Sequence, residues 1–155
     1  MEKATFAAGC FWGVEYKFGK IPGVSKTAVG YEGGHLDHAT YRDVCEGDTG
    51  HAEVVELEFD PAKVPYADLV KFFFTLHNPT QLNYQGPDHG TQYRSAIFYH
   101  SPQQKAVAEQ VKNELNAAHF KGKIVTQIAP ATTFWPAEEY HQKYAEKHPG
   151  HHCAL

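Results

Sequence analysis

The feature that most constrains the fold is an alternation between two hydrophobic periods along the chain. Strand-like segments are separated by segments with helical spacing, and glycine or proline marks most of the boundaries. Strands are predicted over residues 3–7, 24–31, 52–59, 95–99 and 124–128. Helices are predicted over residues 11–18, 66–76, 101–118 and about 136–147, and polar loops over 35–50 and 80–93.

The order that results is β-α-β-β-α-β, followed by a further helix, strand and helix. This order favours an α+β domain of ferredoxin-like type over a doubly wound parallel sheet. We therefore expect a ferredoxin-like two-layer α/β sandwich with an extra C-terminal helix and tail. The 155 residues suit a single domain over 1–155, because no repeat, low-complexity run or linker divides them.

Charge and hydrophobicity exclude several classes of partner. The formal net charge is −4 and no stretch is rich in lysine or arginine, so we do not expect nucleic acid as a partner. No apolar run approaches the roughly 18 residues of a membrane span, and Met1-Glu2-Lys3 leads into a strand instead of a signal sequence. We therefore expect a cytoplasmic protein without a membrane partner.

Three widely spaced cysteines, Cys10, Cys45 and Cys153, form neither a CxxC pair nor the framework of a small secreted domain. Cys10 falls where a predicted strand turns into a helix. The free N–H groups and the macrodipole of a helix N-terminus stabilise a thiolate there. Taken alone, this position also suits a small buried core residue, and both interpretations stay open.

The sequence around Cys10 is Gly9-Cys10-Phe11-Trp12-Gly13. It resembles the active-site signature of the A-type peptide methionine sulfoxide reductases, and further segments resemble that family in the same order: 50–54 (GHAEV), 86–95 (GPDHGTQYRS) and 140–144 (YHQKY). The resemblance covers essentially the whole chain. It implies thiol-dependent reduction of methionine S-sulfoxide, free or in proteins, with Cys10 as the nucleophile that attacks the oxidised sulfur.

Glu53 is the candidate acid. Strand periodicity places it on the same face as Val55, Leu57 and Phe59, towards the core, where a carboxyl group resists ionisation. Holding it protonated near neutral pH requires a pKa raised by roughly three units, on the order of 4 kcal/mol. From the pattern alone, a position at the strand end that reaches solvent is equally compatible. The resemblance favours the acid, which would protonate the sulfoxide oxygen as sulfur is attacked.

Two polar loops contribute Tyr41, Asp88 and Tyr93. Loops rich in such residues are usually surface turns without a catalytic role. Only the resemblance implies that these three residues converge on Cys10. In the family, the two tyrosine hydroxyls help Glu53 to hold the sulfoxide oxygen. Phe11 and Trp12 receive the substrate methyl group, and Asp88 is a polar pocket residue that acts through water.

Recycling is predicted to involve Cys153. Attack by Cys10 leaves a sulfenic acid, which condenses with a second thiol to a disulfide. Cys153 is the third residue from the C-terminus, and the family places its recycling cysteines in such tails. The resemblance implies that thioredoxin reduces the Cys10–Cys153 disulfide. This tail has one glycine and no second cysteine, unlike many in the family. Cys45 matches no catalytic position and is interpreted as structural.

Two other classes of function remain as alternatives. A thiol hydrolase or acyl transferase built on Cys10 would need a histidine base; the sequence pairs none with it, although His51 and His89 stay open. A metal-handling protein could use the C-terminal cluster of His148, His151, His152 and Cys153. Adjacent histidines suit a single zinc site poorly, so we expect neither a catalytic metal nor a cofactor.

Overall fold

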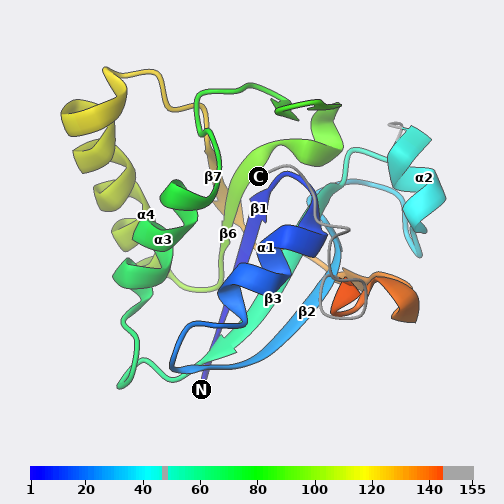
Figure 1. The fold of residues 1–155 in the computed structure, drawn as a ribbon, viewed down its shortest axis with the longest axis horizontal. Coiled ribbons are helices and arrows are strands. Elements are labelled where there is room, and N and C mark those ends of the chain that lie inside the picture. The colour runs from blue at the N-terminus through cyan, green and yellow to red at the C-terminus, as the bar shows by residue number, and fades with distance from the viewer. Residues whose placement is uncertain (47–48, 145–155) are drawn as a thin grey trace.

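The computed structural model describes residues 1–46 and 49–144. Its centre is a six-stranded sheet with the order β7-β6-β1-β3-β2-β8, and helices pack against it (Figure 1). The strands of this sheet are β1 (Glu2–Ala8), β2 (Val24–Glu32), β3 (Ala52–Phe59), β6 (Ser95–Tyr99), β7 (Gln127–Pro130) and β8 (Trp135–Pro136). All neighbouring strands are antiparallel except β6 and β7, which are parallel. The predicted mixture of helices and strands is confirmed.

Helices and one small hairpin complete the described chain. The α-helices are α1 (Phe11–Phe18), α2 (Tyr41–Glu46), α3 (Tyr66–Leu76) and α4 (Pro102–Leu115). A π-helical turn, η2 (Asn116–Phe120), extends α4, and η1 (Thr91–Tyr93) and η3 (Glu139–His141) are single 3-10 turns. The hairpin consists of β4 (Tyr84–Gln85) and β5 (Asp88–His89). The short α2 and this hairpin lie inside the segments that were predicted as loops.

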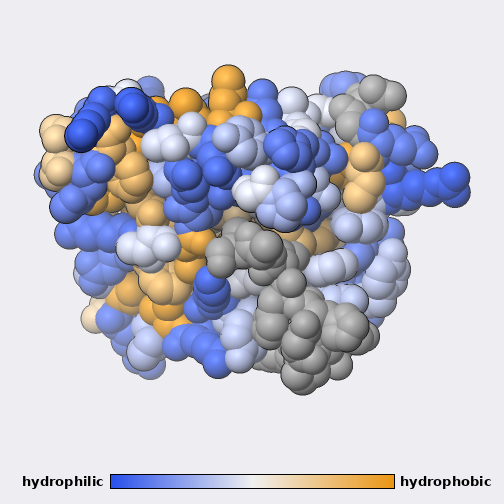
Figure 2. Space-filling model, turned by 45° about the horizontal axis from the view of Figure 1, so that its top comes forward, coloured by the Kyte–Doolittle hydropathy of each residue, from blue (hydrophilic) through white to orange (hydrophobic). Residues whose placement is uncertain are grey.

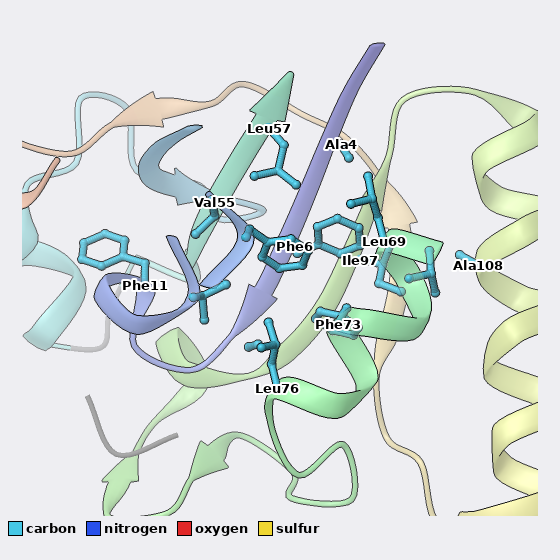
Figure 3. Close-up of a cluster of buried hydrophobic side chains, with 14 of the residues drawn as sticks. Ala4, Phe6, Phe11, Val55, Leu57, Leu69, Phe73, Leu76, Ile97 and Ala108 are labelled. Carbon is cyan, nitrogen blue, oxygen red and sulfur yellow. The ribbon is translucent and has the colours of Figure 1, made fainter. Parts of the chain in front are cut away.

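The main core lies between the sheet and helices α1 and α3. Phe6 of β1 points from the sheet toward Phe73 of α3 (Figure 3), with ring centroids 5.2 Å apart. Its ring also stacks on Phe18 of α1 at 4.9 Å. Each fully buried aromatic side chain contributes about 1.5–3 kcal/mol by leaving water. This packing fixes α1 across β1 and therefore fixes the N-terminus of α1, where Cys10 lies.

A smaller apolar cluster covers the opposite face of the sheet. It contains Ala7, Ala52, Val54, Ala96 and Phe98, with Phe134 packed against them. Strand β3 is buried on both faces. Ala52 and Val54 belong to this smaller cluster, whereas Glu53 and Val55 point to the opposite face of the sheet, where α1 packs. The core-side position predicted for Glu53 is therefore confirmed.

The predicted helix over 136–147 is wrong for the residues that the structure describes. Trp135 and Pro136 instead pair with β2 as strand β8, and only the single turn η3 follows. The backbone N–H of Ala137 donates to Val29 O, so a partner on the sheet replaces the helical one. Lys143 has a φ of 56°, which also ends any helix. Residues 145–147 lie outside the described part of the chain.

The predicted strand over 124–128 is also misplaced, because β7 begins only at Gln127. The N–H of Ile124 donates to the side chain of Asn116, and that of Val125 donates to Pro79 O. These two residues are therefore held by a helix end and a loop instead of by the sheet.

The face in Figure 2 is mostly hydrophilic, and its hydrophobic surface gathers on the left, the side where α3 and α4 lie in Figure 1. Across residues 1–46 and 49–144, no helix combines the length and apolar character needed to cross a bilayer.

Candidate active site

Cys10 occupies the junction between β1 and α1. Gly9 has a φ of 91°, a conformation that glycine adopts without strain, and it turns the chain from the sheet into the helix. Cys10 is the N-cap residue of α1 and is 8% exposed. The strand–helix junction predicted from the sequence is therefore present. Reduced Cys10 would lie beside the first N–H groups and the positive dipole end of α1, which favour a thiolate.

Glu53 is linked directly to the residue that follows Cys10. The backbone N–H of Phe11 donates to Glu53 Oε1 at 3.2 Å. Glu53 is 1% exposed, and among the described residues its Oε2 has no hydrogen-bond partner. Burial raises the pKa of Glu53 to about 8, opposed by the Phe11 N–H and reinforced by the charge of Asp88. The carboxyl group is therefore largely neutral at pH 7.

Three tyrosines lie within electrostatic reach of Glu53. Burial and then the charge of Glu53 raise the pKa of both Tyr41 and Tyr93. Glu53 also raises the pKa of Tyr31, after burial and the nearer carboxylate of Glu138. All three phenols therefore stay protonated at neutral pH and can donate hydrogen bonds. The structure thus places the predicted residues Tyr41 and Tyr93 within the electrostatic reach of Glu53.

Asp88 reaches the site from the β4–β5 hairpin. It is partly buried on β5, and its charge acts on both Glu53 and Tyr93. Gly90, with a φ of 133°, then turns the chain into η1, which carries Tyr93. The sequence could not establish that the two distant loops converge near the start of α1. The structure brings Tyr41, Asp88 and Tyr93 together there.

Phe11 and Trp12 form an aromatic wall together with Tyr41. The ring centroid of Tyr41 lies 6.2 Å from that of Phe11 and 6.2 Å from that of Trp12. Trp12 also stacks on Tyr144 at 3.9 Å and is only partly buried. An apolar group could therefore lie against Trp12 while a polar group meets the hydroxyls and Glu53.

Three residues of this region were missed by the sequence analysis. Tyr31 is fully buried opposite Glu53 in the sheet, and its hydroxyl donates to Glu138 Oε1 at 3.1 Å. Glu138 also accepts the backbone N–H of Tyr41 at 3.2 Å. His141 accepts a hydrogen bond from Trp12 Nε1 at 2.9 Å. The motif at residues 140–144 was the only sequence signal for any of these contacts, and no role was assigned to it.

Cys45 lies closer to the site than its interpretation as structural suggested. Burial raises the pKa of its thiol, while hydrogen bonds with Tyr41 and Tyr93 lower it, and the net shift is upward. Cys45 is therefore less prone to ionise than an ordinary cysteine. Cys153, the predicted recycling residue, falls outside the described residues, as do His148, His151 and His152 of the metal hypothesis.

The histidines weighed as a base for Cys10 are engaged elsewhere. His51 accepts the N–H of Gly34 on Nδ1 and hydrogen-bonds Leu36 O through Nε2, so neither ring nitrogen is available. His89 is exposed and stacks on Tyr84. Within residues 1–46 and 49–144, no three His, Cys, Asp or Glu side chains gather as a metal site.

Comparison with known proteins gives one consistent family. The family model described as peptide methionine sulfoxide reductase matches residues 2–155. A peptide methionine sulfoxide reductase MsrA of Acidobacterium capsulatum is 61% identical over 148 residues, which are 95% of this chain and 95% of the relative.

Solved structures agree with this. The crystal structure of Mxr1 from Saccharomyces cerevisiae in reduced form has a TM-score of 0.93 and 38% identity, and the match covers 98% of this chain and 88% of that chain. A structure of the same yeast protein in complex with Trx2 has a TM-score of 0.65 and 27% identity, covering 93% and 84% respectively.

Proposed function

The chain belongs to the peptide methionine sulfoxide reductase family, and on this premise we propose that it reduces methionine S-sulfoxide through Cys10, with Glu53 as the acid. The observation that carries this assignment is the hydrogen bond from Phe11 N–H to Glu53 Oε1. It ties a buried, protonated carboxyl group to the residue next to the nucleophile. A neutral acid can give a proton to the departing oxygen, whereas a carboxylate cannot.

The proposed chemical step transfers the sulfoxide oxygen from methionine to Cys10. The sulfur of Cys10 attacks the sulfur of the sulfoxide, and Glu53 protonates the sulfoxide oxygen, which weakens its bond to the methionine sulfur. The oxygen, with the proton from Glu53, is then transferred to the Cys10 sulfur while the transient S–S bond and the original S–O bond break. Cys10 is thereby oxidised to a sulfenic acid, and methionine is released reduced. Glu53 Oε1 accepts the Phe11 N–H, which leaves Oε2 to carry the proton.

The remaining pocket residues have supporting roles in this proposal. The hydroxyls of Tyr41 and Tyr93 help to hold the sulfoxide oxygen, since both stay protonated beside Glu53. Phe11 and Trp12 receive the methyl group, and Asp88 acts as a polar pocket residue through water. The family implies a preference for the S epimer. A pocket with separate places for the methyl group and the oxygen can discriminate between the two epimers.

Recycling completes the cycle. The sulfenic acid of Cys10 condenses with the thiol of Cys153, a disulfide forms and water leaves. A dithiol of the thioredoxin class then reduces this disulfide and is itself oxidised. The complex of the structurally similar yeast protein with Trx2 supports such a partner. No cofactor enters the cycle, and methionine-sulfoxide-containing proteins and peptides are its substrates.

We also propose the finer description of the fold. The four strands β6-β1-β3-β2 are consecutive in the sheet and mutually antiparallel, in the β-α-β-β-α-β order of a ferredoxin-like sandwich. Strands β7 and β8 extend this core at either edge. A single domain over 1–155 and a cytoplasmic location remain predictions.

An assay with resolved epimers tests the function. The purified chain with dithiothreitol should convert a peptide containing methionine S-sulfoxide to the methionine peptide and leave the R epimer unchanged. Chromatography and mass spectrometry measure the methionine peptide that is formed and the R epimer that remains. Failure to form methionine from the S epimer, or equal reduction of both epimers, would contradict the proposal. A thiol hydrolase would instead cleave ester or amide substrates and leave the sulfoxide intact.

A further inference from the structure

A groove that the proposed chemistry does not use begins at Trp12 and runs along α1. One face of α1 forms one wall, and residues 24–27 of β2 together with Lys143 form the other. We propose that this groove is a subsite for the substrate chain and receives an acidic side chain that lies two residues from the methionine sulfoxide. The inference rests on the proposed function and deepens it, because it names a preferred class of substrate.

The size of the groove suits one side chain. Its volume is about 140 Å³. Pockets that hold a whole small molecule usually enclose roughly 300–1,000 Å³. The groove is therefore too small for a second substrate or a cofactor, but it can hold a single side chain of a peptide that is bound at Trp12.

The groove lies within reach of a peptide whose sulfoxide occupies the site. The residues of α1 that line it are spaced by three or four positions, so they share one face of the helix: Trp12, Glu15, Tyr16 and Gly19. Glu15 lies three residues beyond Trp12, about 4.5 Å along the helix axis. An extended chain advances roughly 6.6 Å over two residues and points those two side chains the same way. The side chain two positions from the sulfoxide is therefore the one that reaches the groove.

Lys143 is held in the groove by both its backbone and its side chain. Its N–H donates to Glu15 Oε1 at 2.6 Å, and its Nζ donates to Thr27 Oγ1 at 3.3 Å. Its φ of 56° is uncommon for a residue other than glycine, and the bond to Glu15 holds the backbone there. A lysine ammonium has three donors, so two remain for a ligand.

The groove presents positive charge although the whole chain carries a formal charge of −4. Lys26 and Lys143 line it, both are exposed, and over the described part of the chain neither forms an ion pair. The ammonium of Lys20 lies 4.3 Å from the ring centroid of Tyr16, which also lines the groove.

Glu15 adds little opposing charge to the surface of the groove. Among the described residues that line the groove, it is the only acidic one. It is 3% exposed, and each of its two carboxyl oxygens already accepts a hydrogen bond. A carboxylate of the substrate therefore meets the two exposed ammonium groups of Lys26 and Lys143, whereas a substrate lysine would be repelled by them.

The experiment compares peptides that differ in one residue near methionine S-sulfoxide. Asp, Asn or Lys is placed two positions before or two positions after the sulfoxide, in an otherwise uncharged peptide with blocked ends. The second-order rate constant of methionine formation is measured with the reduced full chain and dithiothreitol at low salt. In one of the two positions the Asp peptide should react about twofold to fivefold faster than the Asn peptide, the effect of an exposed ion pair, and the Lys peptide should react more slowly. The preference should shrink in about 1 M salt, which screens exposed charges.

Substitutions of Lys143 test whether its charge causes the preference. Lys143→Gln should remove most of the difference between the Asp and Asn peptides, Lys143→Arg should keep it, and Lys143→Glu should make the Lys peptide the faster one. All three variants retain the backbone N–H that Glu15 holds, so the local fold is preserved. Lys123→Gln is the matched control, because Lys123 is exposed beyond η2, away from the groove, and its loss changes the net charge equally. It should leave the preference as in the wild type.

Three results would overturn the inference. They are equal rates for the Asp and Asn peptides at both positions in the wild type, an undiminished preference in Lys143→Gln, and an equal loss of preference in Lys123→Gln, which would show that net charge alone attracts the peptide. A wild-type chain that reduces none of the peptides would instead refute the proposed function itself.

Discussion

Glu53 combines two properties that a carboxyl group rarely has together. It lies at 1% exposure in the core, yet its Oε1 accepts an N–H bond that favours the charged form. Burial outweighs this bond, and the pKa rises to about 8. The residue is therefore suited to give up a proton near neutral pH, since the best general acids have a pKa close to the working pH.

Glu53→Gln should lower the single-turnover rate about 10²- to 10⁴-fold, the usual contribution of a general acid, while the domain stays folded. Glutamine preserves the size of the side chain and a hydrogen-bond donor, so a residual rate should remain. Rapid-quench measurement of methionine formation checks this. In the wild type, the same rate should fall as the pH rises through about 8, because the acid ionises there. A mutant with the wild-type rate would exclude Glu53 as the proton donor.

Glu32 provides a separate pH test at the residue scale. It is fully buried on the other face of β2, and burial raises its pKa to about 7, with an opposing bond from Thr132 N–H. Above about pH 4.5 the unfolded chain loses this proton while the folded chain retains it until about pH 7. The stability that Glu32 contributes is therefore present at low pH and is lost as the pH rises through about 7.

Denaturant unfolding at pH 5 and pH 8 measures this loss. The free energy of unfolding of the wild type should fall across that range, with a share from Glu32 on the order of 1–3 kcal/mol. Glu32→Gln should show a smaller fall because glutamine does not ionise. An identical fall in both proteins would contradict the assignment.

At the scale of elements, the site depends on where short segments meet the sheet. The bounds of β3 and β6 match the prediction to the residue, because their apolar residues alternate or run continuously within clear boundaries. The segment after Trp135 was mispredicted because its hydrogen bonds go to β2, far away in the sequence. Local patterns carry no information about such partners.

The same limit applies to the site. Local patterns predicted the strand–helix junction of Cys10 and the core-side face of Glu53, but only the resemblance favoured their roles as nucleophile and acid. The convergence of Tyr41 and Tyr93 was available only through the resemblance, since loops carry no period. Tyr31 and Glu138 could not be predicted at all, because their contact joins residues 107 positions apart.

Glu138 leads to a prediction at this scale. It accepts the N–H of Tyr41, the first residue of α2, and the hydroxyl of Tyr31. Glu138→Ala should lower the single-turnover rate about tenfold, since hydrogen bonds to charged groups contribute about 1.5–3 kcal/mol and Tyr41 loses its anchor. Glu138→Gln should lose less. Glu139→Ala, at the neighbouring position, is the control. An equal fall in the single-turnover rate of Glu139→Ala and Glu138→Ala would count against the role of Glu138.

At the scale of the whole molecule, the proposed cycle uses residues from the two ends of the chain. Cys10 follows the first strand, and Cys153 is the third residue from the C-terminus. The chemistry at Cys10 needs only the pocket, whereas recycling needs the tail and a reductant. The two stages can therefore be separated by substitution.

Cys153→Ser should still release about one methionine per enzyme molecule, because attack by Cys10 comes first. Turnover with thioredoxin should fall sharply, since the sulfenic acid persists or oxidises further, and dithiothreitol should restore much of the rate. Cys45→Ser is the control and should recycle normally. Full thioredoxin-dependent turnover in Cys153→Ser, or a disulfide between the Cys10 and Cys45 peptides, would move the recycling role away from Cys153.

The central claim is that the oxygen of the sulfoxide passes to Cys10. Its most direct test is mass spectrometry of the Cys45→Ser, Cys153→Ser double variant after one equivalent of methionine S-sulfoxide peptide, with a trap for sulfenic acids. We expect one methionine peptide per enzyme molecule and one trapped sulfenic acid on the Cys10 peptide. The triple variant that also carries Cys10→Ser should form neither product. Stoichiometric methionine formation by the variant that lacks Cys10 would contradict it.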